Sequence, residues 1–191
     1  MTDFKNSFAV TLSSFTTVTL GPPTIVTFNL RKPSRTLDAI FNTEGFRIHI
    51  MSGTRWGKSI ASTMVQSQHG DALSRARLQL ELDPQSAPHS SIENKPLQSS
   101  KHSEGESSNI HLVPLITGPG ILAQMECKVT KSIDIGDHTV LFAEVLDLTE
   151  TMAQDQKTGA NHLPNHDRVA LLYYEGDYAA AEKHEHSRVL A

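Results

Sequence analysis

A dense group of hydroxyl side chains near the N-terminus is the first feature of this sequence that suits ligand chemistry. Its members are Thr11, Ser13, Ser14, Thr16, Thr17 and Thr19, and Asn29, Ser34 and Thr36 extend the polar pattern. Hydroxyl groups both donate and accept hydrogen bonds, so they suit phosphate and polyhydroxyl groups. Ser and Thr are also common in strands and helix caps, and the pattern alone leaves both interpretations open.

The second feature is a cationic stretch at the expected start of a helix. Pro33 and Ser34 form a helix start signal, and Arg31, Lys32 and Arg35 surround it. Helix N-termini attract anions, and guanidinium and ammonium groups neutralise phosphate. The stretch is therefore a candidate phosphate site.

The third feature is the triplet Gly136-Asp137-His138, which is expected to form a tight turn between two strands. Histidine changes charge near neutral pH more easily than any other side chain. His138 is therefore a candidate catalytic residue at the rim of a ligand site. An exposed turn histidine without a role fits the same spacing.

Cysteine and the other histidines give no comparable signal. Cys127 is the lone cysteine and lies on the apolar face of an expected strand, where it should pack as a small hydrophobic group. The scattered histidines fall mainly in expected loops, and a metal site needs several ligands in fixed geometry. We therefore expect no metal. The histidines concerned are His69, His89, His102, His111, His162, His166, His184 and His186.

Composition excludes several classes of function. The chain has 191 residues and a net charge of −4, with both signs spread along it, so nucleic-acid binding has no basic patch to support it. It contains no apolar stretch long enough for a signal peptide or a transmembrane helix. The lone cysteine fits a reducing compartment. We expect a soluble, cytoplasmic protein that binds neither nucleic acid nor membrane.

Hydrophobic periodicity predicts mainly strands with a few short helices. Strands are expected at 8–12, 16–20, 24–30, 46–51, 123–130, 139–148 and 169–174, and helices after Ser34, at 55–65 and at 71–82. The region at about 83–109 has little to bury and is predicted to be a disordered insertion. Residues 154–168 are expected to form a loop, and the chain from Glu182 onward is expected to form a tail. With no βαβ rhythm, the pattern favours a single-domain antiparallel β-barrel over 1–191.

Three motifs in order resemble the flavin reductase-like family. Ser7 to Ile40 resembles its opening pattern S-S-F-T-S-V-S, a Pro-Pro break, an Asn-ending strand and S-x-T-L. Glu126 to Val145 resembles the signature around G-D-H, and Leu171 to Tyr178 resembles the closing strand. The family normally begins with a helix and a strand before the first motif, whereas Met1 to Lys5 alone precede it here. The insertion from Gln66 to Ile110 also replaces a shorter family segment.

The resemblance implies an antiparallel Greek-key split β-barrel that forms a homodimer with FMN near the interface. It places Thr11, Ser13 and Ser14 along the isoalloxazine, Asn29 at the ribityl chain, and Thr17, Ser34 and Thr36 near the phosphate. Thr16 belongs to the same hydroxyl block and is counted with the cofactor-binding residues. His138 would lie beside the nicotinamide or the flavin ring.

The expected activity is therefore hydride transfer from NAD(P)H to FMN, with FAD as an alternative flavin. The reduced flavin would supply a partner monooxygenase or halogenase. Two alternatives stay open: a flavin-binding protein of this fold without efficient reductase activity, and an interaction module without flavin.

Overall fold

A computed structural model describes residues 8–12, 14–66, 91–96, 112–118, 120–150 and 169–180. Within these ranges the chain is mostly β-structure with two helices. The elements in chain order are β1 (Phe15–Thr19), β2 (Ile25–Arg31), α1 (Arg35–Thr43), β3 (Gly45–Met51), α2 (Arg55–Gln66), β4 (Ser91–Pro96), β5 (Leu112–Thr117), β6 (Ile121–Ile135), β7 (His138–Glu150), β8 (Leu171–Tyr174) and β9 (Asp177–Ala180).

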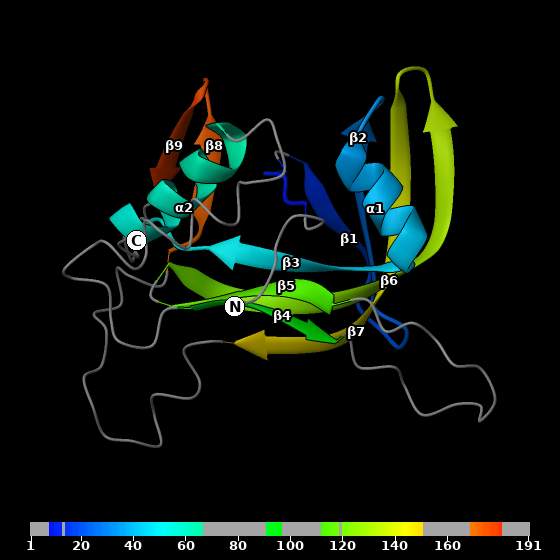
Figure 1. Ribbon diagram of the computed structural model, residues 1–191, viewed down its shortest axis with the longest axis horizontal. Helices are drawn as coiled ribbons and strands as arrows, with labels where there is room; N and C mark the ends of the chain where they lie inside the picture. The colour runs from blue at the N-terminus through cyan, green and yellow to red at the C-terminus, as the bar shows by residue number, and fades with distance from the viewer. Residues whose placement is uncertain are drawn as a thin grey trace, which may run out of the picture.

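Five strands form one antiparallel sheet in the order β1-β2-β7-β6-β3, and β4–β5 and β8–β9 form two separate two-stranded sheets (Figure 1). The long strands β6 and β7 pair with each other along most of their length, and each pairs with a further strand over only one half. β7 pairs with β2 from His138 to Glu144, while β6 pairs with β3 from Ile121 to Lys128. Register shifts in the β6–β7 ladder mark the bend between these halves. The sheet therefore curls into a split barrel, as the resemblance to the flavin reductase-like family implies.

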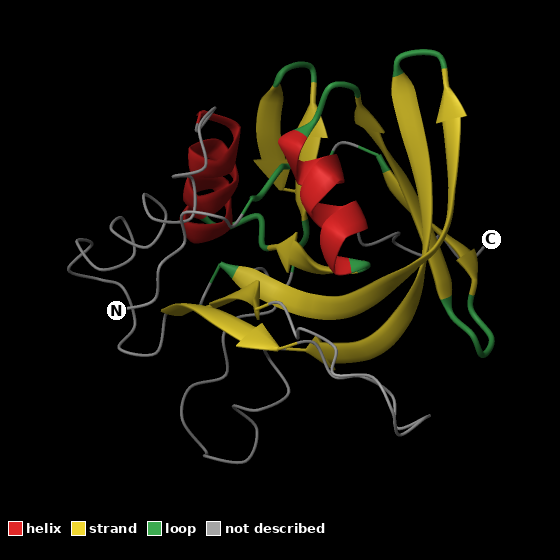
Figure 2. Cartoon of the chain, turned by 45° about the vertical axis from the view of Figure 1, so that its right-hand side comes forward, coloured by secondary structure: helices red, strands yellow, loops and turns green. Residues whose placement is uncertain are grey.

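The main core lies inside this curl, against α1 (Figure 2). Val26, Phe28 and Leu30 alternate along β2 toward it, as the period of two requires. α1 contributes Leu37 and Ile40. The rings of Phe28 and Phe46 meet edge to face, with centroids 5.2 Å apart. Ser34 caps α1, because its Oγ accepts the Leu37 N–H at 3.1 Å.

Cys127 also lies in this core and is fully buried. Burial, with the neighbouring Glu126 carboxylate adding to it, raises the pKa of the thiol to about 12. The thiol therefore stays protonated and packs as a small hydrophobic group, which confirms the prediction.

A second core cluster joins α2 to the far end of the sheet through Ile60, Met64, Ile116 and Ile121. Gly57 makes this packing possible, because a Cβ there would lie 2.0 Å from the Ser52 carbonyl oxygen. No helix in the described part of the chain is long and apolar enough to cross a membrane.

Most predicted elements are confirmed, but two predictions are wrong. Residues 8–12 form no strand, although their side chains alternate. Ser91–Pro96, inside the predicted disordered region, forms β4 and pairs with β5. Pairing uses backbone hydrogen bonds, so poor apolar composition does not prevent it. β9 was not predicted. The expected helix at 71–82, the loop at 154–168, the tail and the rest of 83–109 lie outside the described residues.

Candidate functional site

One face of the sheet turns away from the core and carries several of the predicted residues. Directly opposed residues in an antiparallel ladder place their side chains on the same face. Thr16 opposes Thr27, which opposes Phe142, and Arg31 opposes His138. Asn29 opposes Val140 on the same face. We call this the outer face, made of Ser14, Thr16, Thr27, Asn29, Arg31, His138, Val140 and Phe142.

Ser14 and Asn29 are linked on the outer face. The Asn29 amide donates from Nδ2 to Ser14 Oγ at 3.0 Å, and both side chains are exposed. The Ser14 hydroxyl hydrogen and the Asn29 carbonyl oxygen therefore remain available to a ligand. Arg31 lies four positions after Thr27 along β2, so the face extends for roughly 13 Å beside β1 and β7.

The turn between β6 and β7 closes one end of the outer face. Gly136 and Asp137 form this turn, with Gly136 at φ 59°, a conformation that glycine adopts without strain. The backbone N–H of Lys32 donates to the Asp137 carbonyl oxygen at 2.7 Å. This bond fixes the turn beside the end of β2.

Asp137 joins Arg31 to His138 at this turn. Its Oδ2 accepts from Arg31 Nε at 2.9 Å, and its Oδ1 lies 2.7 Å from His138 Nδ1. The hydrogen bond with His138, assisted by the charge of Arg31, holds the pKa of Asp137 below its usual value. The carboxylate is therefore ionised at neutral pH.

Asp134 forms a parallel contact on the other side of the hairpin. It accepts from Thr139 Oγ1 at 2.6 Å and pairs with Lys32 Nζ at 3.0 Å. The Thr139 hydrogen bond and then Lys32 lower the pKa of Asp134. Arg31 and Lys32 therefore each have a carboxylate partner within the protein.

The start of α1 lies next to the end of β2. In the described part of the chain, no acceptor contacts the backbone N–H groups of Arg35 and Thr36, as expected for a first helical turn. Arg35 is exposed and has no ion-pair partner among the described residues. Of the three cations that the sequence singles out, Arg35 is thus the one whose charge is available to an anion.

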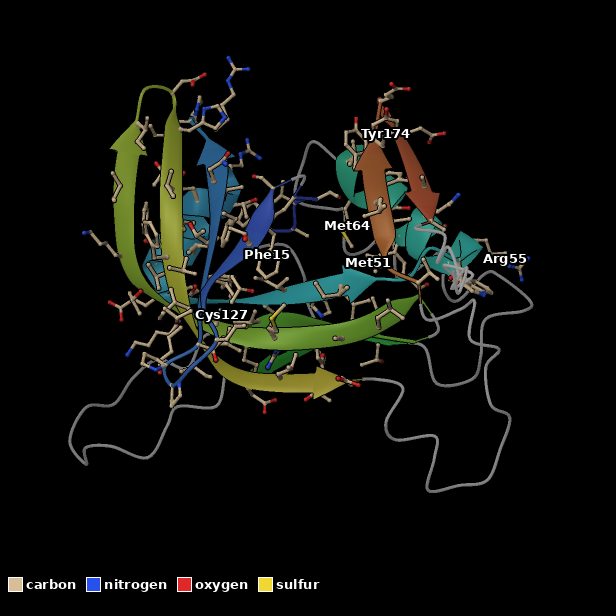
Figure 3. All side chains as sticks on the ribbon, turned by 180° about the vertical axis from the view of Figure 1, so that it is seen from behind. Phe15, Met51, Arg55, Met64, Cys127 and Tyr174 are labelled. Carbon is tan, nitrogen blue, oxygen red and sulfur yellow. The ribbon has the colours of Figure 1, made fainter. Side chains whose placement is uncertain are left out.

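A separate hollow of about 550 Å³ lies on the opposite side of the sheet, between the N-terminal segment, α1, β3, α2 and the β8–β9 hairpin. We call it the inner hollow. Figure 3 shows Phe15 of β1 and Met64 of α2 on opposite sides of it. Six aromatic residues contribute to its lining: Phe8, Phe15, Phe28, Phe46, Tyr173 and Tyr178.

Buried polar groups lie along the edge strand β3. Arg47 forms an ion pair with Glu126 and donates from Nη1 to the Val113 carbonyl oxygen at 2.6 Å. His49 accepts the Ile116 N–H on Nε2 at 3.0 Å. Burial, and then the charge of Arg47, lowers the pKa of His49 to about 4, so its imidazole is neutral. Alternation along β3 does not indicate this group, because β5 covers the face of β3 that alternation assigns to solvent.

The structure divides the predicted site residues among several places. Ser14, Thr16, Asn29 and His138 share the outer face. Ser34 caps α1, three residues after the end of β2. Thr36 lines the inner hollow, as does Thr11, whose Oγ1 donates to the Ala61 carbonyl oxygen at 3.3 Å. Thr17 opposes Val26 on the core-facing side of β1, and Ser13 lies outside the described residues. None of Ser14, Thr17 and Ser34 lines the inner hollow.

Comparison with known proteins defines the class to which this fold belongs. The family model for the flavin reductase like domain matches residues 2–182, so the chain belongs to the flavin reductase-like family. This confirms the family predicted from the three sequence motifs.

Solved structures share the split-barrel fold at low sequence identity. The nitrilotriacetate monooxygenase component B homologue of Mycobacterium thermoresistibile matches with a TM-score of 0.59 at 22% identity, over 96% of this chain and 80% of its own. The NADH:FAD oxidoreductase of Streptomyces globisporus matches at 0.58 and 19%, over 91% and 78%. The styrene monooxygenase flavin reductase of Pseudomonas putida matches at 0.56 and 17%, over 93% and 83%.

Proposed function

We propose that this chain is a flavin reductase that holds FMN against the outer face and catalyses hydride transfer from NAD(P)H to the flavin. The observation that carries the proposal is the convergence of Ser14, Asn29, Thr16 and His138 on one exposed face. Residues far apart in sequence meet there, and the start of α1, which follows β2 along the chain, offers N–H groups that have no acceptor among the described residues. FAD is the alternative flavin.

The residues of the outer face fit the parts of FMN. The Ser14 hydroxyl and the Asn29 amide suit the polar edge of the ring and the ribityl hydroxyls. Thr27, Val140 and Phe142 add a surface that is half-buried and partly apolar, against which a planar ring can pack. Thr11 and Thr17 point elsewhere, and the proposal assigns them no contact.

The start of α1 suits the phosphate. The N–H groups of Arg35 and Thr36 would donate to it, and the Ser34 hydroxyl retains its hydrogen for a phosphate oxygen while Oγ caps Leu37. The Arg35 guanidinium would neutralise charge, because Arg31 and Lys32 are paired with Asp137 and Asp134.

Flavin, when bound, supplies the redox chemistry, and the protein supplies binding, orientation and electrostatics. Hydride transfer requires no catalytic acid, so the role of the outer face is to hold two ring systems at reacting distance. His138, at the end of the face, would contact the nicotinamide. The Gly136-Asp137 turn fixes its place beside β2.

We also propose a homodimer and a partner oxygenase that consumes reduced flavin. The outer face continues onto β6 through Ile133, which opposes Val140, and Ile135, which opposes His138. Both isoleucines are exposed, and a second copy would cover them. Light scattering measures the oligomeric state, and Ile133→Lys with Ile135→Lys should yield monomers.

The proposal is tested by purifying the chain, adding FMN and NADH or NADPH, and following nucleotide oxidation. Flavin binding with turnover is the expected result. Bound flavin without turnover would leave a flavin-binding protein that is not a reductase. Absence of flavin binding would leave an interaction module.

A further inference from the structure

The β6–β7 hairpin carries two carboxylates with different partners, Asp137 in the turn and Asp134 near the end of β6. Asp137 contacts the Nδ1 atom of His138, whereas Asp134 contacts Thr139 and Lys32 and does not contact His138. Both side chains are exposed to similar degrees. The hairpin therefore offers one carboxylate that contacts His138 and a matched control that does not.

The contact between Asp137 and His138 fixes which ring nitrogen carries the hydrogen. An ionised carboxylate only accepts hydrogen bonds, so Nδ1 must be the donor at 2.7 Å. In the neutral imidazole, Nε2 is then an acceptor. Arg31, the last residue of β2, donates to the other carboxylate oxygen of Asp137, and the N–H of Lys32, the next residue, donates to the Asp137 carbonyl oxygen. Two contacts at the end of β2 therefore fix the position of Asp137.

We propose that Asp137 is a positioning residue, which holds His138 with Nε2 as an acceptor for the carboxamide N–H of the nicotinamide. The proposal rests on the proposed function and adds to it a residue and a substrate contact. The carboxamide is the nicotinamide group that donates hydrogen bonds. Asp137 itself touches neither ring and acts through His138 alone.

The first test needs neither flavin nor turnover. Histidine labelled with ¹³C and ¹⁵N reports the tautomer of each imidazole by NMR at about pH 8.5, well above the ordinary histidine pKa of about 6.5. The His138→Gln variant assigns the signal. We expect the Nδ1–H form in the wild type and in Asp134→Ala, and a shift toward the Nε2–H form that water favours in Asp137→Ala. An unchanged tautomer in Asp137→Ala would overturn the proposal.

The second test uses two reductants with FMN present. NADH carries the carboxamide, and reduced 3-acetylpyridine adenine dinucleotide replaces its amino group with a methyl group. The ratio of kcat/KM for the two should fall about fivefold in Asp137→Ala and in His138→Ala, and stay constant in Asp134→Ala. A general loss of structure lowers kcat/KM for both reductants equally, so it leaves the ratio unchanged.

Three results would count against the proposal, and they are distinguishable. A tautomer change with an unchanged ratio would overturn the role of Asp137 while the proposed function stands. An equal fall in Asp134→Ala would show that the turn acts only structurally. A wild type that binds FMN but oxidises neither reductant would contradict the proposed function, and the positioning role would fall with it.

Discussion

Two arginine–carboxylate pairs in this protein have similar chemistry and opposite surroundings. The side chains of Arg47 and Glu126 are 2% and 10% exposed beneath β5, whereas those of Arg31 and Asp137 are 77% and 59% exposed at the β6–β7 turn. A buried pair cannot lose one member without leaving a charge in the interior, while water screens an exposed pair. The first pair therefore secures the fold, and the second is open to a ligand.

The largest effect should come from breaking the buried pair. Glu126→Gln leaves the Arg47 charge buried without its carboxylate, and we expect a loss of about 3–5 kcal/mol in the free energy of unfolding. Urea unfolding followed by circular dichroism measures it. A loss below about 1 kcal/mol, the range of exposed pairs, would show that the two pairs are equivalent.

The next effect concerns His49, which lies beside Arg47. Its pKa falls from 6.5 to about 4 on folding, so below pH 6.5 the unfolded chain binds a proton that the folded protein does not. Stability contributed by the neutral imidazole is complete above pH 6.5 and is lost as the pH falls toward 4. The loss should reach about 3 kcal/mol, at 1.36 kcal/mol per pKa unit.

Unfolding free energies measured between these pH values in the wild type and in His49→Gln isolate this contribution. Glutamine carries an acceptor for the Ile116 N–H but does not titrate, so its curve should be flatter by that amount. Parallel curves for the two proteins would show that His49 is not held neutral.

A smaller effect separates the available cation from the paired ones. Arg35→Gln should weaken FMN binding about tenfold, roughly 1.4 kcal/mol, while riboflavin, which lacks phosphate, binds as before. Arg31→Gln is the matched control and should weaken neither ligand as much. Flavin fluorescence titration measures all four affinities. Equal losses for FMN and riboflavin would remove Arg35 from the phosphate site.

The smallest effect should be that of the exposed pair on stability. Arg31→Gln removes the Asp137 contact at the surface, and we expect no resolvable change in the free energy of unfolding, because water screens the pair. Urea unfolding at low and at high salt measures this change. A loss similar to that of Glu126→Gln would mean that the turn also secures the fold.

Hydrophobic periodicity and helix start signals within a segment were sufficient to predict most helices and strands, but not all of them. β2, α1, β3 and α2 each follow from their own periodicity and start signals. Residues 8–12 alternate in the same way yet form no strand, because a strand also needs a partner edge. β4 is the opposite case: its composition does not predict a strand, yet it forms one because β5 supplies an edge with which it pairs.

The candidate site was predicted only in its residue types. That Ser14, Asn29 and His138 share a face depends on the pairing of β2 with β7, two strands more than a hundred positions apart. Periodicity within one segment carries no information on that register. For the same reason the positions of His49 and Arg47 could not be predicted, because both side chains are covered by β5, which comes much later in the sequence.

Flavin is proposed to bind the outer face and not the inner hollow. Thr16→Trp places a bulky ring on the outer face at an exposed position, and Ala39→Phe fills part of the inner hollow. FMN affinity, measured by fluorescence titration for both variants, tests the claim directly. We predict at least about a tenfold loss for Thr16→Trp and no loss for Ala39→Phe, since only the first obstructs the proposed contacts. Unimpaired binding in Thr16→Trp with a loss in Ala39→Phe would contradict the claim.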